Sequence, residues 1–418
     1  MDKLIIDGGR PLAGLVRVSG AKNSVLPILA ATILAEGPVQ LRNVPELRDV
    51  STMAKLLEEM GAVTSSAEEY KVDASSLSSF RAPYELVKTM RASFLVLGPL
   101  LTKYGKAEVS LPGGCAIGAR PVNLHIKGLE AMGAKIQVES GYVKARAPRG
   151  LKGAEIFLEI ASVGATENLI MAAVLAEGKT VIHNAAEEPE ITDLINFLMK
   201  MGAKISGAGT SVVEIEGVRS LRSISHSIIG DRVEAGTFLI AGAALGGEIE
   251  VQGFDPNHLT VVLEKLKMSG ANLEISQDSV KLGMSLSRPE PVDIETGVYP
   301  GFPTDMQAQY MVLNCIASGK SVIQERIFEN RFLHVQELSR LGAVIELRGN
   351  STAVVTGVNK LTAAQVMATD LRASSSLVIA ALIAQGKTVI DRIYHIDRGY
   401  EAIEHKIRAL GGVIERAS

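Results

Sequence analysis

Residues 129–134 read LEAMGA, and five other segments of this chain resemble them. In each one, a helical pattern of apolar residues ends at a glycine, which is followed by alanine or by a second glycine. The six segments are LEEMGA (Leu57–Ala62), LEAMGA (Leu129–Ala134), LMKMGA (Leu198–Ala203), LKMSGA (Leu266–Ala271), LSRLGA (Leu338–Ala343) and IRALGG (Ile407–Gly412). Because self-similarity at a fixed period is typical of repeat architectures, six copies of one unit are predicted.

The spacing of these segments indicates how the copies are grouped. Their glycines are 72, 69, 68, 72 and 69 residues apart. Gly270 therefore lies 209 residues after Gly61, and Gly342 and Gly411 follow Gly133 and Gly202 by the same distance. Chance rarely produces such an offset. We interpret it as a duplicated half, in which each half holds three units of roughly 70 residues.

Each unit also contains an earlier helix of small and aliphatic residues, such as NSVLPILAATILAEG (23–37) and ENLIMAAVLAEG (167–178). A helix that is apolar all round is expected to be buried. A strand, a second helix and two further strands are predicted to follow, so the fold class is α/β, with sheets around buried helices. A glycine in the left-handed conformation is expected to end each buried helix. The six candidates are Gly37, Gly105, Gly178, Gly247, Gly319 and Gly386.

The composition limits the classes of function. The chain has 418 residues, of which 47% are hydrophobic and 21% charged, so two or three globular domains are expected. A net charge of −3 does not attract nucleic acid or an acidic membrane, and neither is expected as a partner. The first 14 residues hold no long apolar segment, so a cytoplasmic location is expected. Two cysteines 200 positions apart fit a reducing compartment, and no metal site is predicted.

Three Gly-Lys-Thr or Gly-Lys-Ser sequences look like the end of a nucleotide-binding phosphate loop. The first glycine of that motif is replaced by Ala173, Ala381 and Asn314. These sequences also lie between a helix and the next strand, whereas a phosphate loop joins a strand to the N-terminus of a helix. ATP or GTP binding is therefore not predicted.

Unusual polar residues gather at two equivalent places in the units. One place is the start of the buried helix (19–24, 89–93, 162–168, 230–237, 302–309 and 368–375), and the other is the loop after the next strand (184–191, 326–332 and 392–400). If two such ends face each other, they form a cleft suited to phosphate or carboxylate groups. Its cations would be Lys22, Arg91, Arg120, Arg232, Arg331, Arg372 and Arg398. Each arginine taken alone has a second interpretation, as a solvated surface residue.

Several acidic residues and both cysteines have two possible interpretations. Asp305, Asp231, Asp370 and Glu188 could each cap a helix, or act in a cationic cleft as a carboxylate that accepts a hydroxyl proton; capping is favoured for Glu188. The segment LPGGCAIGARPV (111–122) has glycines that permit a mobile loop, which could carry Cys115 into the cleft or hold it as a bystander. Cys315 is expected in the core. His125 and His395 are assigned no role in proton transfer.

Six motifs together resemble the enolpyruvyl transferases, and they extend over nearly the whole chain. They are SGAKNS (19–24), PGGCAIGARPV (112–122), FPTDMQAQ (302–309), FENRF (328–332), MATDLRAS (367–374) and YHIDRGYE (394–401). The closest resemblance is to the members that act on UDP-N-acetylglucosamine. It implies a two-domain inside-out α/β barrel with three repeats per domain. Residues 22–229 would bind the nucleotide sugar and carry the Cys115 loop, and residues 1–21 with 230–418 would form the catalytic domain.

The resemblance also implies an activity. The enolpyruvyl group of phosphoenolpyruvate would be transferred to the 3-hydroxyl of UDP-N-acetylglucosamine by addition and elimination, with release of phosphate. This is the first committed step of peptidoglycan synthesis. The expected partners are phosphoenolpyruvate and UDP-N-acetylglucosamine, and no metal or organic cofactor is expected.

The family motifs imply a role for individual residues. Lys22, Arg120 and Arg398 would hold the phosphate of phosphoenolpyruvate, with Arg331 and Arg372 nearby. Asp305 would act at the reacting hydroxyl, and Asp370 is a second candidate for proton handling. Cys115 would protonate the methylene carbon as a general acid, and it can also form a covalent adduct. The nucleotide sugar would be lined by Asn23, Arg91, Arg120, Pro121, Val122, Asn123, Leu124, Ser162, Val163, Gly164, Asp305 and Ile327.

The chain departs from the family pattern at two places. Asn123 stands where many relatives have aspartate, and Ile160 and Ala161 stand where some have a lysine that contacts the pyrophosphate. Two other functions stay open at this stage. One is the shikimate-pathway enolpyruvyl transferase, in which a loop cysteine is not expected; the other is a non-catalytic repeat protein that binds sugar nucleotides.

Overall fold

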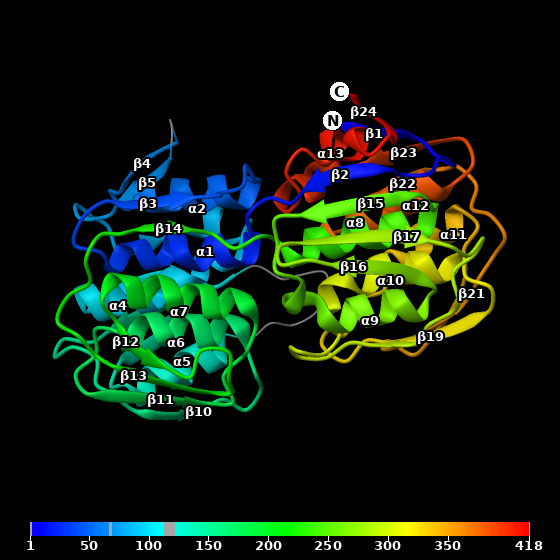
Figure 1. Cartoon of the computed structure of the whole chain (residues 1–418). Coiled ribbons are helices and arrows are strands. Elements are labelled where there is room, and N and C mark those ends of the chain that lie inside the picture. The colour runs from blue at the N-terminus through cyan, green and yellow to red at the C-terminus, as the bar shows by residue number, and fades with distance from the viewer. Residues whose placement is uncertain (1, 67–68, 113–121, 418) are drawn as a thin grey trace. The chain divides into compact units, whose positions relative to one another are not determined.

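The predicted repeats form sheets of one common topology (Figure 1). The computed structural model describes residues 2–66, 69–112 and 122–417. In one repeat, β10 (Glu155–Phe157) pairs in parallel with β11 (Lys179–His183), which pairs antiparallel with β13 (Val212–Glu216). A fourth strand, β12 (Lys204–Ser206), pairs antiparallel with β13. The same parallel, antiparallel, antiparallel order recurs in all six four-stranded sheets of the described residues.

The other five sheets have the same order of strands. They are β14 (Ser225–Ser227), β3 (Val39–Arg42), β5 (Tyr70–Asp73) and β4 (Val63–Ser65); β6 (Arg81–Ala82), β7 (Lys106–Ser110), β9 (Tyr142–Arg146) and β8 (Lys135–Glu139); β2 (Gly14–Arg17), β15 (Glu248–Gln252), β17 (Ser279–Met284) and β16 (Ala271–Ile275); β18 (Ile294–Glu295), β19 (Lys320–Gln324), β21 (Thr352–Thr356) and β20 (Val344–Arg348); and β22 (Gln365–Met367), β23 (Lys387–Asp391), β1 (Lys3–Asp7) and β24 (Val413–Ala417).

The described residues divide into two compact units with three sheets each. Unit 1 contains residues 2–19 and 230–417, and unit 2 contains residues 20–112 and 122–229. The N-terminal strand β1 lies in the last sheet of unit 1, where Ile5 is opposite both Val389 on β23 and Glu415 on β24. In unit 2, β14, near the C-terminal end of residues 122–229, completes the sheet of β3, β5 and β4 by pairing in parallel with β3. In each unit, one sheet is thus completed by a strand that is distant in sequence from its partners.

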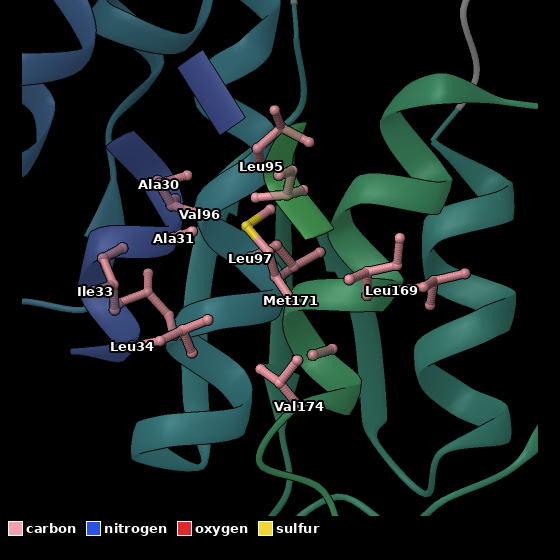
Figure 2. Close-up of a cluster of buried hydrophobic side chains, with 14 of the residues drawn as sticks. Ala30, Ala31, Ile33, Leu34, Leu95, Val96, Leu97, Leu169, Met171 and Val174 are labelled. Atoms are coloured by element: carbon pink, nitrogen blue, oxygen red, sulfur yellow. The ribbon is translucent and has the colours of Figure 1, made fainter. Parts of the chain in front are cut away.

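A set of apolar helices fills the interior of each unit, as predicted. Unit 2 contains α1 (Lys22–Ala31), α4 (Leu97–Tyr104) and α6 (Val163–Ala173), and unit 1 contains α8 (Arg232–Leu245), α10 (Gln307–Cys315) and α12 (Leu371–Ile383). Every residue of α10 is buried, and α8, α10 and α12 contact one another. In unit 2, Leu97, Leu169 and Met171 lie close together in the core (Figure 2). No helix among the described residues is long and apolar enough to cross a membrane.

The second helix of each of the six repeats ends at the predicted glycine. These helices are α2 (Arg48–Glu59), α5 (Asn123–Ala131), α7 (Pro189–Met201), α9 (Thr260–Met268), α11 (Val335–Arg340) and α13 (Ile403–Ala409). The glycine follows within two residues in every case, with φ between 87° at Gly411 and 111° at Gly202. Because this left-handed conformation strains any residue that has a side chain, glycine is required there. Shorter helices are α3 (Tyr84–Val87), η1 (Thr32–Leu34), η2 (Arg91–Val96), η3 (Pro256–Leu259), η4 (Thr304–Met306) and η5 (Ile393–Arg398).

The glycines expected to end the buried helices act as predicted at Gly105, which caps α4 with φ 69°, and at Gly247, which follows Gly246 at the end of α8 and has φ 97°. The prediction was wrong elsewhere. Gly37 and Gly319 do not have positive φ, and α6 and α12 end several residues before Gly178 and Gly386. The reason is a short extended stretch between these helices and the next strand, which forms parallel bridges such as Ala35 with Leu221, Lys152 with Glu177, and Thr362 with Gln385.

Ser19, the last residue of unit 1 before the chain enters unit 2, is held by a buried ion pair. Its backbone N donates to Glu234 Oε2 (2.7 Å), and Lys406 Nζ donates to Glu234 Oε1 (2.6 Å) and to Ser19 Oγ (2.7 Å). The following residue, Gly20, leaves no room for a side chain, because a Cβ there would lie 1.8 Å from the carbonyl oxygen of Asn43. Burial raises the pKa of Glu234 to about 7, although Lys406 acts to lower it.

Glu234 should make the stability of the protein depend on pH. Its pKa is about 7 in the folded chain, against an ordinary 4.5, so its stabilising contribution is complete below about pH 4.5 and is lost as the pH rises through 7. A shift of this size corresponds to about 3 kcal/mol in the free energy of unfolding. Denaturant unfolding should show that the free energy of unfolding falls less between about pH 5 and pH 8 in Glu234→Gln than in the wild type. Glu264→Gln, at an exposed position, is the control, and equal losses in all three proteins would contradict the prediction.

Candidate active site

Three aspartates lie at the starts of the buried helices of unit 1, and two of them cap a helix. Asp231 Oδ1 accepts hydrogen bonds from the backbone N of Val233 (2.8 Å) and of Glu234 (3.0 Å) at the start of α8. Asp370 Oδ1 accepts from the backbone N of Arg372 (2.8 Å) and of Ala373 (3.0 Å) at the start of α12. Both side chains therefore accept hydrogen bonds from helix N–H groups, so the helix-capping role, one of the two alternatives in the sequence analysis, is the one observed.

Asp305 is the exception, because it does not cap a helix. Pro303 occupies the N-cap position of η4, so Asp305 lies inside the first turn. Its Oδ1 accepts a hydrogen bond from Arg331 Nη2 (2.8 Å), and its Oδ2 accepts one from Arg372 Nη2 (2.7 Å). The side chain of Asp305 is 28% exposed, whereas those of Arg331 and Arg372 are 4% and 7% exposed. Two buried guanidinium groups thus hold one accessible carboxylate.

Arg372 carries its charge inside unit 1. Burial alone lowers the pKa of Arg372, but Asp305, Tyr400 and Asp231 oppose it, and the net pKa lies above the ordinary value. His334 interacts electrostatically with Arg331 and does not add a third positive charge. Its pKa is lowered to about 4, chiefly by burial, with Asp370 acting to raise it and Arg331 acting to lower it.

A buried polar network that the sequence did not reveal supports the segment around Asp305. Gln309 Nε2 donates to the carbonyl oxygen of Asp305 (3.0 Å) and to Thr237 Oγ1 (3.2 Å). The Thr237 hydroxyl lies 2.8 Å from the Tyr400 hydroxyl, so the network joins α8, α10 and the segment that follows η5. All three residues belong to the polar segments singled out in the sequence (230–237, 302–309 and 392–400), but the sequence does not show that they bond to one another.

The loops after β19 and β23 carry the other predicted residues of unit 1. Ile327 and Phe328 follow β19, and their backbone N–H groups donate to Glu325 Oε1 (2.8 and 3.1 Å). Arg398 ends η5 and is half-buried. It lies near His395, whose pKa is lowered by burial and by Arg398. These positions confirm that the polar residues gather at helix starts and in the loops after the strands.

Unit 2 presents its own set of predicted residues at helix starts. Lys22 and Asn23 begin α1, and Lys22 Nζ lies 2.9 Å from the buried Asp49 Oδ2. Ser162 caps α6 by accepting a hydrogen bond from the backbone N of Ala165 (3.4 Å), and Val163 and Gly164 form the first turn. Arg91 begins η2, and Val122, Asn123 and Leu124 lie at the start of α5. Asn123 is exposed and Leu124 is buried.

His125 is fixed in the interior of unit 2 as a neutral ring. Asn168 Nδ2 lies 3.0 Å from His125 Nδ1, while Asn168 Oδ1 accepts a hydrogen bond from the backbone N of Gly98 (2.6 Å). Burial, together with the charge of Arg91, lowers the pKa of His125 to about 3. The ring therefore stays uncharged at neutral pH. Ile160 is 64% exposed.

Comparison with known proteins identifies the family. Residues 6–407 match the family model described as EPSP synthase (3-phosphoshikimate 1-carboxyvinyltransferase). The chain belongs to the enolpyruvyl transferase family. Curated relatives called UDP-N-acetylglucosamine 1-carboxyvinyltransferase include one from Shewanella amazonensis, which is 58% identical over 100% of both chains. Another, from Shewanella halifaxensis, is 58% identical over 100% of this chain and 99% of the relative.

Solved structures of enolpyruvyl transferases have the same fold. The enolpyruvyl transferase NikO from Streptomyces tendae matches 100% of this chain and 99% of its own, with a TM-score of 0.88 and 25% identity. An EPSP synthase from Acinetobacter baumannii matches 100% of both chains, with a TM-score of 0.76 and 17% identity. These matches confirm the predicted α/β fold class.

Three residues that the resemblance assigns to an enolpyruvyl transferase site lie outside the described residues. They are Cys115, Arg120 and Pro121. The other cysteine, Cys315, is fully buried in α10, and burial raises the pKa of its thiol to about 12. Cys315 is therefore a core residue, as predicted.

Proposed function

We propose that this enolpyruvyl transferase transfers the enolpyruvyl group of phosphoenolpyruvate to the 3-hydroxyl of UDP-N-acetylglucosamine and releases phosphate. The full-length similarity to the Shewanella relatives supports the choice of acceptor. The single structural observation that carries the chemistry is the Asp305 carboxylate between Arg331 and Arg372. The reaction would be the first committed step of peptidoglycan synthesis, carried out in the cytoplasm.

Asp305 is the proposed proton acceptor for the sugar hydroxyl. Its two arginine contacts favour the ionised form, which is the form that can accept a proton. The same contacts weaken it as a base. A phosphoenolpyruvate anion bound beside Arg331 and Arg372 would offset their charge and restore basicity to Asp305. Binding of one substrate would in this way prepare the base for the other.

The phosphate of phosphoenolpyruvate is assigned to Lys22, Arg120 and Arg398. Lys22 already faces Asp49, but an ammonium group has three donors and can hold a phosphate oxygen at the same time. Arginine offers a planar fork that fits two phosphate oxygens. These cations stabilise the negative charge of the phosphate throughout the reaction.

The chemistry needs a proton delivered to carbon as well as one removed from oxygen. In the addition step, the thiol of Cys115 gives its proton to the methylene carbon, and the sugar oxygen bonds to the neighbouring carbon while its proton passes to Asp305. In the elimination step, the Cys115 thiolate takes back a proton from the new methyl group as phosphate leaves, which restores the double bond, and the proton held by Asp305 passes to the phosphate or to solvent. Asp370 is a second candidate for this proton handling.

Unit 2 is proposed to bind the nucleotide sugar. The residues assigned to this role are Asn23, Arg91, Arg120, Pro121, Val122, Asn123, Leu124, Ser162, Val163 and Gly164, with Asp305 and Ile327 from unit 1. The amide of Asn123 can accept and donate hydrogen bonds, so uridine recognition is retained without the carboxylate of other relatives. Ile160 does not supply the charge of a lysine, so one pyrophosphate contact is absent from this proposal.

Phosphate release should require UDP-N-acetylglucosamine together with phosphoenolpyruvate. The competing substrate is shikimate 3-phosphate, because the matched family model is named for the transferase that uses it. We expect phosphate release with UDP-N-acetylglucosamine and none above background with shikimate 3-phosphate, measured in parallel under the same conditions. Comparable turnover with shikimate 3-phosphate would overturn the proposed acceptor. Binding of UDP-N-acetylglucosamine without turnover would instead favour a non-catalytic binding protein.

A further inference from the structure

Glu325 is a buried carboxylate that accepts hydrogen bonds from four groups. It follows β19 and is 2% exposed. Its Oε1 accepts from Thr296 Oγ1 (2.9 Å) and from the backbone N of Ile327 (2.8 Å) and of Phe328 (3.1 Å). Its Oε2 accepts from Thr304 Oγ1 (2.9 Å). A carboxylate without these partners would be strongly disfavoured in the interior, so the arrangement is specific.

The four donors come from three segments of unit 1. Thr304 directly precedes Asp305 in η4. Ile327 and Phe328 open the loop that leads to Arg331, which itself donates to Asp305. Thr296 follows β18, and its hydroxyl also accepts from the backbone N of Arg326 (2.8 Å). One side chain therefore ties the segment of the proposed base to the loop that carries a proposed sugar contact.

We propose that Glu325 is a positioning residue, which fixes Asp305 relative to the loop of residues 326–331. It does not touch the substrates in this proposal. Oε2 sets the position of the base through Thr304, and Oε1 sets the position of Ile327. The inference rests on the proposed function, because the two tethered segments matter together only if one acceptor sugar contacts both.

The two oxygens of Glu325 can be tested separately. Thr304→Val removes only the hydroxyl that faces Oε2, and a shift of the base should lower kcat about 10-fold with little change in the KM for UDP-N-acetylglucosamine. Thr296→Val removes a hydroxyl that faces Oε1 and should raise that KM with little change in kcat. Glu325→Gln should change both constants, because a neutral amide oxygen is a weaker acceptor than a carboxylate oxygen, and because an NH₂ group replaces the acceptor that faces Thr304. Thr304→Ser restores the hydroxyl and should restore kcat.

A measurement that does not depend on turnover separates this inference from the proposed function. Amide hydrogen exchange of residues 327–331 should be faster in Glu325→Gln and in Thr296→Val than in the wild type, and unchanged in Thr304→Val. Residue 326 is left out, because its own N–H donates to Thr296 Oγ1. If the wild type does not release phosphate, the proposed function fails, and the exchange rates still decide whether Glu325 fixes the loop. Unchanged exchange in Glu325→Gln would overturn the inference. Equal kcat loss in Thr304→Val and Thr304→Ser would also overturn it, because the hydroxyl would then have no part in the effect.

Discussion

Asp305→Asn is expected to lower kcat by about 10²- to 10⁴-fold while both substrates still bind. Asparagine keeps the size of aspartate, but it cannot accept the proton of the sugar hydroxyl. One of its terminal groups is an NH₂ that would face Arg331 or Arg372, so one guanidinium group also loses its acceptor. Turnover is measured by phosphate release, and binding of UDP-N-acetylglucosamine by titration calorimetry. Loss of binding equal to the loss of turnover would contradict a role in the chemical step.

Two other aspartates provide matched controls for this variant. Asp231→Asn makes the same chemical change at a helix cap, and asparagine caps a helix as well as aspartate does. It should keep kcat near the wild-type value. Asp370→Asn tests the second candidate, whose carboxylate also caps a helix. A slow Asp370→Asn variant beside a fast Asp305→Asn variant would assign the proton transfer to Asp370.

The repeat architecture could be predicted because the second helix of every repeat must end in the same way. The second helices must end at a residue that tolerates positive φ, and this requirement placed glycine at Gly61, Gly133 and their four counterparts. The first strand of each sheet was not predicted. It is as short as two residues in β6 (Arg81–Ala82), and such a stretch has no measurable alternation.

The place of the N-terminal strand could not be predicted from the repeat spacing. The segment KLIID of β1 alternates in burial like the other inner strands, so its pattern fits any of the six sheets. Its partners, β23 and β24, lie at the opposite end of the chain. Pairing over such a separation leaves no local signal, because it is set by the packing of the whole unit.

The chemistry of the site could be predicted more readily than the partners of each side chain. Asp231, Asp305 and Asp370 occur in similar polar segments, and only the backbone distinguishes the two caps from the third carboxylate. Pro303 takes the N-cap position, and Asp305 lies two residues later, inside the first turn. The sequence also contains a pattern that indicates the burial of Glu325. Ser321 and Ile323 face inward on β19, and continuing this alternation by two residues predicts that Glu325 is buried.

Cys115→Ala is expected to abolish turnover with little loss of affinity for UDP-N-acetylglucosamine. If Cys115 is the general acid, alanine removes the proton that the methylene carbon must receive, and effects of such groups are typically about 10²- to 10⁴-fold. Cys115→Asp should retain part of the activity, because a carboxylic acid can also deliver a proton. Both variants are measured by phosphate release at several pH values. Normal turnover of Cys115→Ala would make Cys115 a bystander.

Labelling of the thiol tests the same residue by its nucleophilicity. An electrophilic phosphonate epoxide should add once to the wild type and should spare Cys115→Asp. Cys315 is the internal control, because it is fully buried and its pKa is raised to about 12, so its thiolate is scarce at neutral pH. Cys315→Ala should therefore label like the wild type, as followed by intact-mass spectrometry. The two measurements together separate an acid from an ordinary reactive thiol. If Cys115 is an ordinary reactive thiol, the wild type is labelled, but Cys115→Ala keeps normal turnover. If Cys115 is the acid, Cys115→Ala loses both labelling and turnover, and Cys115→Asp regains turnover without labelling.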